Sequence, residues 1–501
     1  MSHPSPDALR REAAERLTAL QGRSLTPRDR LAIPPQEMPS REPAERIRHV
    51  EEVALGYWPE QARLEALRCL QCKNAPCVEG CPVRINIPAF IKALAEGRDA
   101  EAMAVIRRNS LLPAVCGRVC PQEVQCQERC TVGQALKDVR KAVSIGRLER
   151  FAADAERQSG RFQPPPVKPE TGRRVAVIGS GPAGITVAAD VRREGHAVTL
   201  FEAFHKPGGV LVYGIPEFRL PKAIVELEIE TLQAMGVEIR TNFLVGRTRR
   251  LEDLLKEDGY DAAFIGAGAG LPRFLEIEGE NLVGVFSANE YLTRANLMRA
   301  FDRQRADTPI YPARRVIVVG GGNVAMDAAR MALRLGAEEV HLVYRRTEAE
   351  MPARIEEVEH AKEEGVRFHV LHAPRRVIGN AAGRVTGLEC IRCRLGEPDA
   401  SGRPAPVEIP GSEYVIEADA VIVAIGNEPN PLIRQTTPGL QADQRGRLIV
   451  DPATGQTSLP RVYAGGDVVL GSATVILAMG QGRQAAAAIN AFLASLPPRS
   501  A

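Results

Sequence analysis

The sequence predicts an α/β protein in which two Rossmann-like domains follow an all-helical domain. Two segments, beginning at Val175 and Val316, each run from a short apolar strand into a glycine-rich turn and then into a helix. This order is typical of domains built on parallel strands. Ahead of them, helical periodicity extends from Pro43 to Leu70, and eight cysteines lie between Cys69 and Cys130.

The size and charge of the chain exclude several classes of protein. A length of 501 residues suggests about three domains. Sixty-five basic and sixty-two acidic residues leave a net charge of +3, which gives no field for nucleic acid or an anionic membrane. No apolar run approaches the roughly 20 residues that span a bilayer. The polar N-terminus lacks the apolar core of a secretory signal, so we expect a cytoplasmic protein without nucleic-acid or membrane partners.

Composition shifts divide the chain into four parts. Residues 1–40, rich in Pro, Arg and Glu, are expected to form a partly ordered arm, and residues 41–165 the helical domain. Prolines between Gln163 and Pro169 mark a linker, because proline cannot continue a helix. The first Rossmann-like domain is then predicted to span 166–305 and 427–501, and the second 306–426.

The first strand leads into a dinucleotide-binding fingerprint, G-x-G-x-x-G, written here as Gly179-Ser180-Gly181-Pro182-Ala183-Gly184. The first glycine allows a tight turn, the second lets the backbone approach a pyrophosphate, and the third lets helix and strand pack closely. The pyrophosphate would lie at the helix N-terminus, where free N–H groups favour an anion. Glu202, about 20 residues further on, would bind the ribose hydroxyls.

A second motif near the C-terminus identifies the nucleotide as FAD. There a strand ends in Gly466 and Asp467, and Ala473 and Thr474 precede a helical stretch. This resembles the second FAD motif of the two-dinucleotide flavoproteins. The resemblance implies that Asp467 binds the flavin ribityl chain and that the helix points its N-terminus at the isoalloxazine ring. The alternative is a solvated acid in a turn.

The second glycine-rich turn differs from the first where the acid would stand. Gly320, Gly322 and Ala325 hold the three fingerprint positions, and Asn323 lies between them. Tyr344 occupies the place of Glu202, and the next residues are Arg345 and Arg346. An acid would repel a 2′-phosphate, whereas guanidinium groups would bind it. The pattern therefore predicts NADP(H); two solvated arginines at a strand end are the alternative.

The eight clustered cysteines form two groups with the spacing of iron–sulfur proteins. They are Cys69-x2-Cys72-x4-Cys77-x3-Cys81-Pro and Cys116-x3-Cys120-Pro-x4-Cys126-x3-Cys130. Zinc is the rival, since paired cysteines also build tetrahedral zinc sites. The C-x2-C run that ends in Cys-Pro is typical of ferredoxins, and it predicts two [4Fe–4S] clusters. A separate pair, Cys390 and Cys393, lies in an alternating strand-like segment and is interpreted as structural.

Around the cysteines the sequence resembles a known family. The resemblance rests on Arg68-Cys-Leu-Gln-Cys, Gly80-Cys-Pro-Val, Leu112-Pro-Ala-Val-Cys-Gly-Arg-Val-Cys-Pro and Ile145-Gly-Arg-Leu-Glu-Arg-Phe. These runs are similar to the small subunit of NADPH-dependent glutamate synthase, and equally to the large subunit of NADH-dependent ferredoxin:NADP oxidoreductase. The N-terminal half of dihydropyrimidine dehydrogenase is a relative. The similarity extends from about residue 40 to the C-terminus.

The resemblance implies how the clusters are held. One cluster would take Cys69, Cys72, Cys77 and Cys130; the other would take Cys81, Cys120, Cys126 and an eighth ligand. Glu149 is favoured as that ligand, because the relative uses an amide side chain after the same Ile-Gly-x-Leu run, and Cys116 is the alternative. Of the loop expected along the flavin, Gly209 and Arg219 are the predicted contacts.

The predicted parts specify electron transfer. The resemblance implies that NADPH reduces FAD and that the clusters pass electrons to a partner, so hydride transfer needs no catalytic side chain of its own. Because glutamine hydrolysis and imine reduction require further domains, we expect an electron-input subunit in a hetero-oligomer with a larger glutamate synthase subunit. The alternatives are a flavin-bifurcating enzyme with a ferredoxin-reductase-like small subunit, and an electron-carrier module without turnover of its own.

Overall fold

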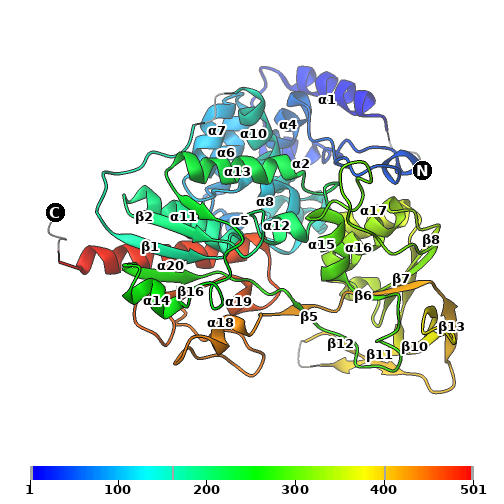
Figure 1. The fold of residues 1–501 in the computed structure, drawn as a ribbon. Helices are drawn as coiled ribbons and strands as arrows, with labels where there is room; N and C mark the ends of the chain where they lie inside the picture. Colours follow the sequence, from blue (N-terminus) through cyan, green and yellow to red (C-terminus); the bar gives the residue numbers. More distant parts are fainter. Residues whose placement is uncertain (1–3, 161–162, 400–401, 498–501) are drawn as a thin grey trace.

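The computed structural model describes residues 4–160, 163–399 and 402–497. The helical domain lies across the top of Figure 1, one parallel sheet lies at the left, and a second lies at the right. Within the described ranges, no helix combines the length and apolar character that crossing a bilayer requires. The α/β architecture with a preceding helical domain confirms the predicted fold class.

Short helices build the N-terminal domain. They are α1 (Pro6–Leu20), α2 (Pro27–Ala32), α3 (Pro43–Arg46), α4 (Pro59–Leu67), α5 (Pro76–Glu79), α6 (Ile87–Ala95), α7 (Asp99–Arg107), α8 (Pro113–Val119), η1 (Gln122–Val124), α9 (Thr131–Ala135), η2 (Val139–Lys141) and α10 (Ile145–Gln158). Their core, around Phe90, Leu94 and Leu148, continues without interruption into the first sheet domain, where it includes Met479. The two domains therefore share one apolar core.

Residues 4–40 form ordered helices where the sequence predicted a partly ordered arm. Ser5 caps α1 by accepting from the Ala8 N–H, and α2 begins with a capping box between Thr26 and Asp29, so both helices have defined starts. Ala13 and Ile33 then pack with Leu64 of α4 in a small core of their own. Because proline is well tolerated in the first turn of a helix, the proline-rich composition here starts helices rather than preventing them.

The periodic stretch from Pro43 to Leu70 is not one helix. It forms α3 and α4, and between them Ala54 makes an antiparallel bridge with Ser40. Gly56 has a φ of +89°, which no helix accommodates, and Pro59 starts α4. The apolar positions between these helices therefore belong to an extended segment.

The first parallel sheet has the strand order β16-β4-β1-β2-β3. Its strands are β1 (Arg174–Ile178), β2 (Ala197–Phe201), β3 (Glu238–Arg240), β4 (Ala262–Ile265) and β16 (Val462–Ala464). Its helices are α11 (Pro182–Arg193), α12 (Val210–Tyr213), α13 (Lys222–Ala234), α14 (Leu251–Lys256), α18 (Leu432–Gln435), α19 (Asp467–Leu470) and α20 (Val475–Ser495). Helices α11 and α20 lie so close that a Cβ on Gly482 would be 2.8 Å from the Ala183 carbonyl oxygen.

The second parallel sheet has the order β6-β14-β7-β8-β9. Its elements are β6 (Val285–Ser287), α15 (Ala288–Asn296), β7 (Arg315–Val319), α16 (Asn323–Arg334), β8 (Glu339–Tyr344), η3 (Glu348–Glu350), α17 (Ile355–Glu363), β9 (Arg367–Val370) and β14 (Ala420–Val423). An antiparallel sheet of β10 (His372–Gly379), β11 (Val385–Pro398), β12 (Pro404–Glu408) and β13 (Tyr414–Glu417) extends it.

The crossing between the two sheets lies earlier in the chain than the predicted boundary at residue 305. A two-stranded ribbon of β5 (Leu271–Pro272) and β15 (Asn427–Glu428) pairs the outgoing and returning segments. Strand β6 then pairs with β14, so residues 285–287 already belong to the second sheet. The glycine-rich turn after β7 marks the nucleotide loop of this domain, but an edge strand comes before it.

Candidate functional site

The first fingerprint has the close approaches that its glycines were predicted to permit. Gly179 has a φ of +95°, and a Cβ there would be 2.4 Å from the Gly266 carbonyl oxygen. A Cβ on Gly184 would be 1.9 Å from the Gly179 carbonyl oxygen, so helix α11 packs directly on the turn. Around Gly181, at the N-cap of α11, no atom lies within 4 Å of a Cβ position. That open space at a helix N-terminus fits a pyrophosphate.

Glu202 and Gly209 both lie at this loop. The buried Glu202 carboxylate accepts hydrogen bonds from the backbone N–H of Ser180 at 3.1 Å and of Phe204 at 2.8 Å. Oε2 also accepts from the Ser180 hydroxyl, whereas Oε1 bonds, among the described residues, only to the Phe204 N–H and can accept a further bond, so a ribose hydroxyl has an acceptor here. Gly209, which starts α12 with a φ of +55°, would place a Cβ 2.8 Å from the Gly181 Cα.

The C-terminal motif meets the first fingerprint at the start of α11. A Cβ on Gly466 would be 3.0 Å from the Ala183 Cβ, which brings Asp467 to the same end of the sheet. Asp467 accepts a hydrogen bond from the Ala473 N–H at 3.0 Å, and burial raises the pKa of its carboxyl to about 6. Thr474 caps α20 by accepting from the Leu477 N–H at 3.4 Å.

Tyr213 is a further candidate for the flavin site that the sequence did not single out. Burial raises the pKa of its phenol, and the Asp467 and Glu202 carboxylates raise it further, so the side chain lies near both acids. It comes from α12, the helix that Gly209 starts. The only signal in the sequence is its place in the loop after two glycines, which does not distinguish it from its neighbours.

Arg219 does not fit its predicted role as a flavin contact. Its guanidinium donates to Asp327 of α16 at 2.6 Å and lies 3.4 Å from Glu357 of α17. Both carboxylates belong to the second nucleotide domain, and the arginine side chain is 5% exposed. Because a buried guanidinium requires paired acids, these two partners account for its position. Arg219 therefore joins the two nucleotide domains.

The second fingerprint repeats the geometry of the first. Gly320 has a φ of +147°, and a Cβ there would be 2.4 Å from the Ala424 carbonyl oxygen. Gly322 is the N-cap of α16, and Ala325 is fully buried in the first turn of the helix. The side-chain oxygen of Asn323, the first residue of α16, accepts from the backbone N–H of Arg354 at 3.0 Å.

The two arginines after β8 have different environments. Arg345 is exposed, and no ion pair of Arg345 is found among the described residues. Arg346 is 2% exposed, pairs with Asp399 and donates to the Pro404 carbonyl oxygen at 2.7 Å. The prediction that both arginines meet a 2′-phosphate is therefore corrected: Arg346 anchors the antiparallel sheet, and Arg345 is the available cation.

Four of the eight clustered cysteines surround one apolar cavity. Cys69, Cys72, Cys77 and Cys130 all line it, although Cys130 lies far from the other three in sequence. Burial raises the pKa of the Cys77 thiol to about 12, and the other three cysteines add to that shift. Cys69, Cys72 and Cys77 are only half-buried. This is the set that the family resemblance implied.

The second set lies deeper. Cys81, Cys120 and Cys126 are buried, and burial raises the pKa of the Cys81 thiol to about 11, with the nearby Glu149 and Cys120 also raising it. Burial also raises the pKa of the Glu149 carboxyl to about 8. The Glu149 Oε1 atom is buried and finds no hydrogen-bond partner among the described residues. Cys116 is buried beside Cys120, and its Sγ lies 3.5 Å from Met479 Sδ.

The arrangement of donors suits clusters better than single ions. In the described part of the chain, no three histidine, cysteine or acidic side chains converge closely enough to hold one metal ion. A cubane cluster instead takes each thiolate on a different iron, so its ligands surround a cavity. The cysteines around the apolar cavity, and the orphaned oxygen of Glu149, fit that requirement. Cys390 and Cys393 are buried in β11 as predicted and remain free thiols.

Helix α20 joins the flavin loop to the second set of cysteines. Thr474, at its start, accepts a hydrogen bond from Gln125 at 3.4 Å, and Met479 contacts Cys116. A Cβ on Gly480 would be 3.2 Å from the carbonyl oxygen of Pro82, the residue after Cys81. The second set is therefore the nearer of the two to the flavin motif.

Known proteins show the same two parts. Residues 46–161 match the family described as dihydropyrimidine dehydrogenase domain II, 4Fe–4S cluster, and residues 173–490 match the pyridine nucleotide-disulphide oxidoreductases. Among solved structures, FprA from Mycobacterium tuberculosis in complex with NADPH shares the fold at a TM-score of 0.53 and 20% identity, over 65% of this chain and 85% of that one.

Two relatives are 40% identical to this chain. The glutamate synthase [NADPH] small chain of Halomonas elongata aligns over 91% of this chain and 96% of its own length. The NADP(+)-dependent formate dehydrogenase subunit beta of Moorella thermoacetica aligns over 84% of this chain, which spans 60% of that relative's length.

These matches define the class first: a flavoprotein of the pyridine nucleotide-disulphide oxidoreductase type joined to an iron–sulfur domain. More narrowly, the chain belongs to the family of the glutamate synthase small chain, as the sequence predicted. It is an NADPH-dependent oxidoreductase whose cofactors are FAD, NADPH and 4Fe–4S clusters, and it serves as an electron-input subunit.

Proposed function

We propose that this chain is the electron-input subunit of a glutamate synthase, with a larger partner that makes glutamate from glutamine and 2-oxoglutarate. The relative from Halomonas elongata supports the proposal, because it matches almost end to end and carries that name. The relative from Moorella thermoacetica is a formate dehydrogenase subunit and has further sequence beyond the shared segment, so a similar segment also occurs in an enzyme with a different reaction. The experiment below separates the two.

The residues divide the work by position. Gly179, Gly181 and Gly184, with Glu202 and Asp467, would hold FAD, and the loop from Gly320 to Ala325 would hold the NADPH pyrophosphate. When bound, FAD accepts a hydride from the nicotinamide and releases electrons singly. The chain supplies orientation: the glycines admit the phosphates, and the N-termini of α11 and α16 stabilise their charge.

Contact between α20 and the second set of cysteines carries the proposal. Met479 lies 3.5 Å from Cys116, and the start of α20 bonds to Gln125, beside Cys126. Cys81, Cys120, Cys126 and Glu149 would therefore hold the cluster nearer to FAD. The half-buried set with Cys69, Cys72 and Cys77 would hold the cluster from which electrons leave for the partner.

Purification from the native source tests the proposal. The chain should carry one FAD and about eight iron atoms, four for each cluster. NADPH should bleach the flavin and support reduction of an artificial acceptor, which a carrier module without turnover would not do. A co-purifying large subunit with glutamine-dependent glutamate formation is the expected result. Co-purification with a formate-oxidising subunit, or zinc in place of iron, would refute the proposal.

A further inference from the structure

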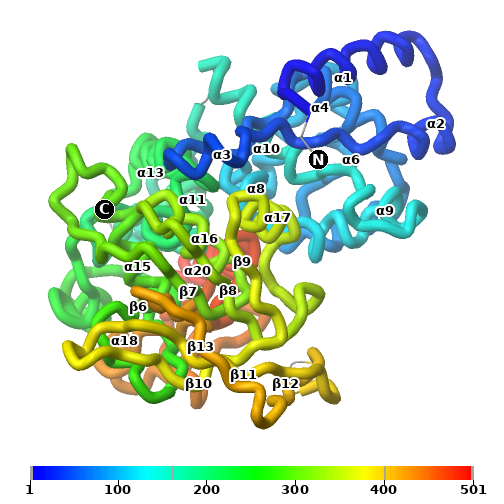
Figure 2. The backbone as a smooth tube through the Cα atoms, turned by 90° about the vertical axis from the view of Figure 1, so that its right-hand side faces the viewer, coloured from blue at the N-terminus to red at the C-terminus, as the bar shows by residue number. Residues whose placement is uncertain are grey.

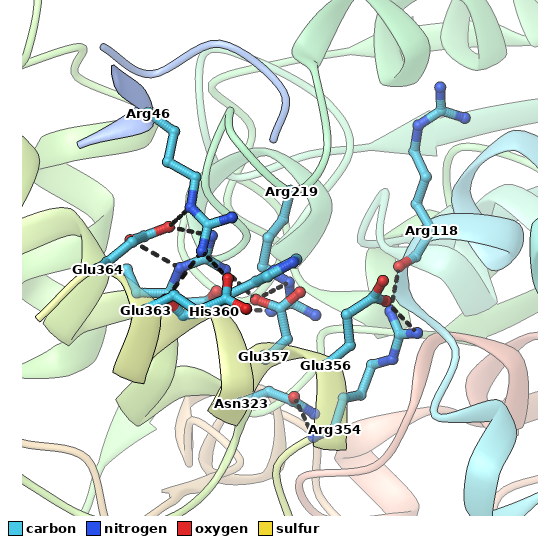
Figure 3. A network of polar contacts seen from close by, with 12 residues as sticks. Arg46, Arg118, Arg219, Asn323, Arg354, Glu356, Glu357, His360, Glu363 and Glu364 are labelled. Carbon is cyan, nitrogen blue, oxygen red and sulfur yellow. Dashed lines mark hydrogen bonds and ion pairs between the residues drawn. The ribbon is translucent and has the colours of Figure 1, made fainter. Parts of the chain in front are cut away.

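Helix α17 holds the second nucleotide domain against the helical domain. In Figure 2 it lies at the end of that domain that faces the helical domain, and Figure 3 shows its acidic side chains among arginines from other parts of the chain. Arg46 of α3 pairs with Glu363 at 2.6 Å and Glu364 at 2.8 Å, and Arg147 of α10 pairs with Glu356 at 3.2 Å. The contact is therefore made by ion pairs from several elements, of which the Arg46–Glu364 pair is buried.

Arg354, immediately before α17, makes a different kind of connection. Its backbone N–H donates to the side-chain oxygen of Asn323, the first residue of α16 in the nucleotide loop, at 3.0 Å. Its guanidinium donates to the Arg118 carbonyl oxygen at 2.7 Å and to Gln122 Oε1 at 3.1 Å, and it pairs with Glu356 at 3.0 Å. One residue thus contacts the nucleotide loop and the helical domain at once (Figure 3).

Gln122 is fixed on its other side. Its amide nitrogen donates to the Cys116 carbonyl oxygen at 3.3 Å. Its backbone carbonyl accepts from the Gln127 N–H at 2.9 Å. A Cβ on Gly146 of α10 would be 2.1 Å from the Gln122 amide nitrogen, so α10 leaves that amide no room to move. Gln122 lies between Cys120 and Cys126 in the sequence, so these contacts fix the segment that carries both cysteines.

We propose that Arg354 is a positioning residue that couples the second nucleotide loop to the buried set of cysteines. The inference rests on the proposed function, in which that loop binds NADPH and that set holds a cluster. The Arg354 backbone is bonded to Asn323, and its planar guanidinium is bonded to Gln122 and to the Arg118 carbonyl oxygen, so a shift of Asn323 on nucleotide binding would be passed through this one residue to Gln122. Because coupling between two sites is reciprocal, the oxidation state at the cysteines must also change nucleotide affinity.

The test uses the purified holoprotein and 2′-phospho-ADP-ribose, which has the pyrophosphate and 2′-phosphate of NADPH but no nicotinamide to exchange electrons. The EPR spectrum and midpoint potential of each cluster are measured with and without this probe. In the wild-type protein, the EPR spectrum and midpoint potential of one cluster should shift when the probe binds. In Arg354→Gln, iron, flavin and probe binding should remain, and the shift should be lost.

Arg46→Gln is the matched control. It also breaks ion pairs between α17 and the helical domain, but Arg46 has no described bond to Asn323 or Gln122. It should keep the shift. If Arg354→Gln unfolds, Arg354→Lys replaces it: lysine keeps a charge for Glu356 but lacks the planar fork, so the shift should still be reduced.

The outcomes separate the inference from the proposed function. A shift that survives in Arg354→Gln, or one that Arg46→Gln also removes, would overturn the role of Arg354. So would an unchanged protein that binds the probe without any spectral change. A protein that lacks iron or does not bind the probe would instead contradict the proposed function. As a second readout, the affinity for the probe should differ between oxidised and reduced protein, and Arg354→Gln should abolish that difference.

Discussion

Replacing Arg345 with alanine should reduce the selectivity for NADPH over NADH, whereas replacing Arg346 should not. The Arg345 guanidinium is exposed at the end of β8, where a 2′-phosphate would lie. A hydrogen bond to a charged group contributes about 1.5–3 kcal/mol, and we take the lower end because this side chain is in contact with solvent. Since 1.4 kcal/mol corresponds to a factor of ten, Arg345→Ala should weaken binding of the 2′-phosphorylated nucleotide about tenfold.

Isothermal titration with 2′-phospho-ADP-ribose and with ADP-ribose measures the effect, because the two ligands differ only in that phosphate. Arg345→Ala should weaken the first and leave the second unchanged, and Arg345→Lys should retain part of the affinity. Arg346→Ala should lower the free energy of unfolding by about 1–3 kcal/mol, since the ion pair with Asp399 and the hydrogen bond to the Pro404 carbonyl oxygen are lost. Equal weakening of both ligands by Arg345→Ala, or selective weakening by Arg346→Ala, would refute the assignment.

Three further changes test other parts of the site. Glu149→Gln should keep about eight iron atoms, four per cluster, but should shift the midpoint potential of one cluster, whereas Cys116→Ser should change neither cluster. Loss of half the iron in Cys116→Ser alone would show that Cys116, not Glu149, is the eighth ligand. At pH values below about 6 the Asp467 carboxyl becomes protonated and no longer accepts hydrogen bonds as a carboxylate, so the affinity of the apoprotein for FAD should decrease there. Asp467→Asn should not show this decrease. An affinity of the unsubstituted apoprotein that does not depend on pH would contradict the prediction. Gly117→Ala should destabilise the protein by about 1–3 kcal/mol, because its Cβ would lie 2.6 Å from the backbone of α10, while Gly270→Ala, in open space, should have no effect on thermal unfolding.

The parts of the site that the sequence predicted best are those with local causes. Gly179, Gly184 and Gly320 are required by the backbone within a few residues or by the adjacent strand, so the strand–turn–helix pattern was enough to place them. The cysteine spacing likewise indicated the clusters, because short loops bring ligands together. The family resemblance added the crossing of Cys130 to the first set, which spacing alone does not provide.

The two corrected arginine assignments involve partners that are distant in sequence. Arg219 bonds to Asp327, 108 residues away, and Arg346 bonds to Asp399, 53 residues away. An arginine at the end of a strand looks the same in the sequence whether it faces solvent or a carboxylate from another layer. Composition misled in the first 40 residues for a related reason, since α1 is held in place by its contact with Leu64.

The position of α20 affects the order in which the protein matures. This helix follows every other described helix in the sequence, yet it lies against α11, which starts at the flavin loop. Its Met479 covers Cys116, in a domain translated hundreds of residues earlier. During synthesis the N-terminal domain folds first, with this face still open to solvent. The Met479 side of Cys116 therefore stays uncovered until α20 has been synthesised, so cluster assembly at the buried set can precede the closing of this contact.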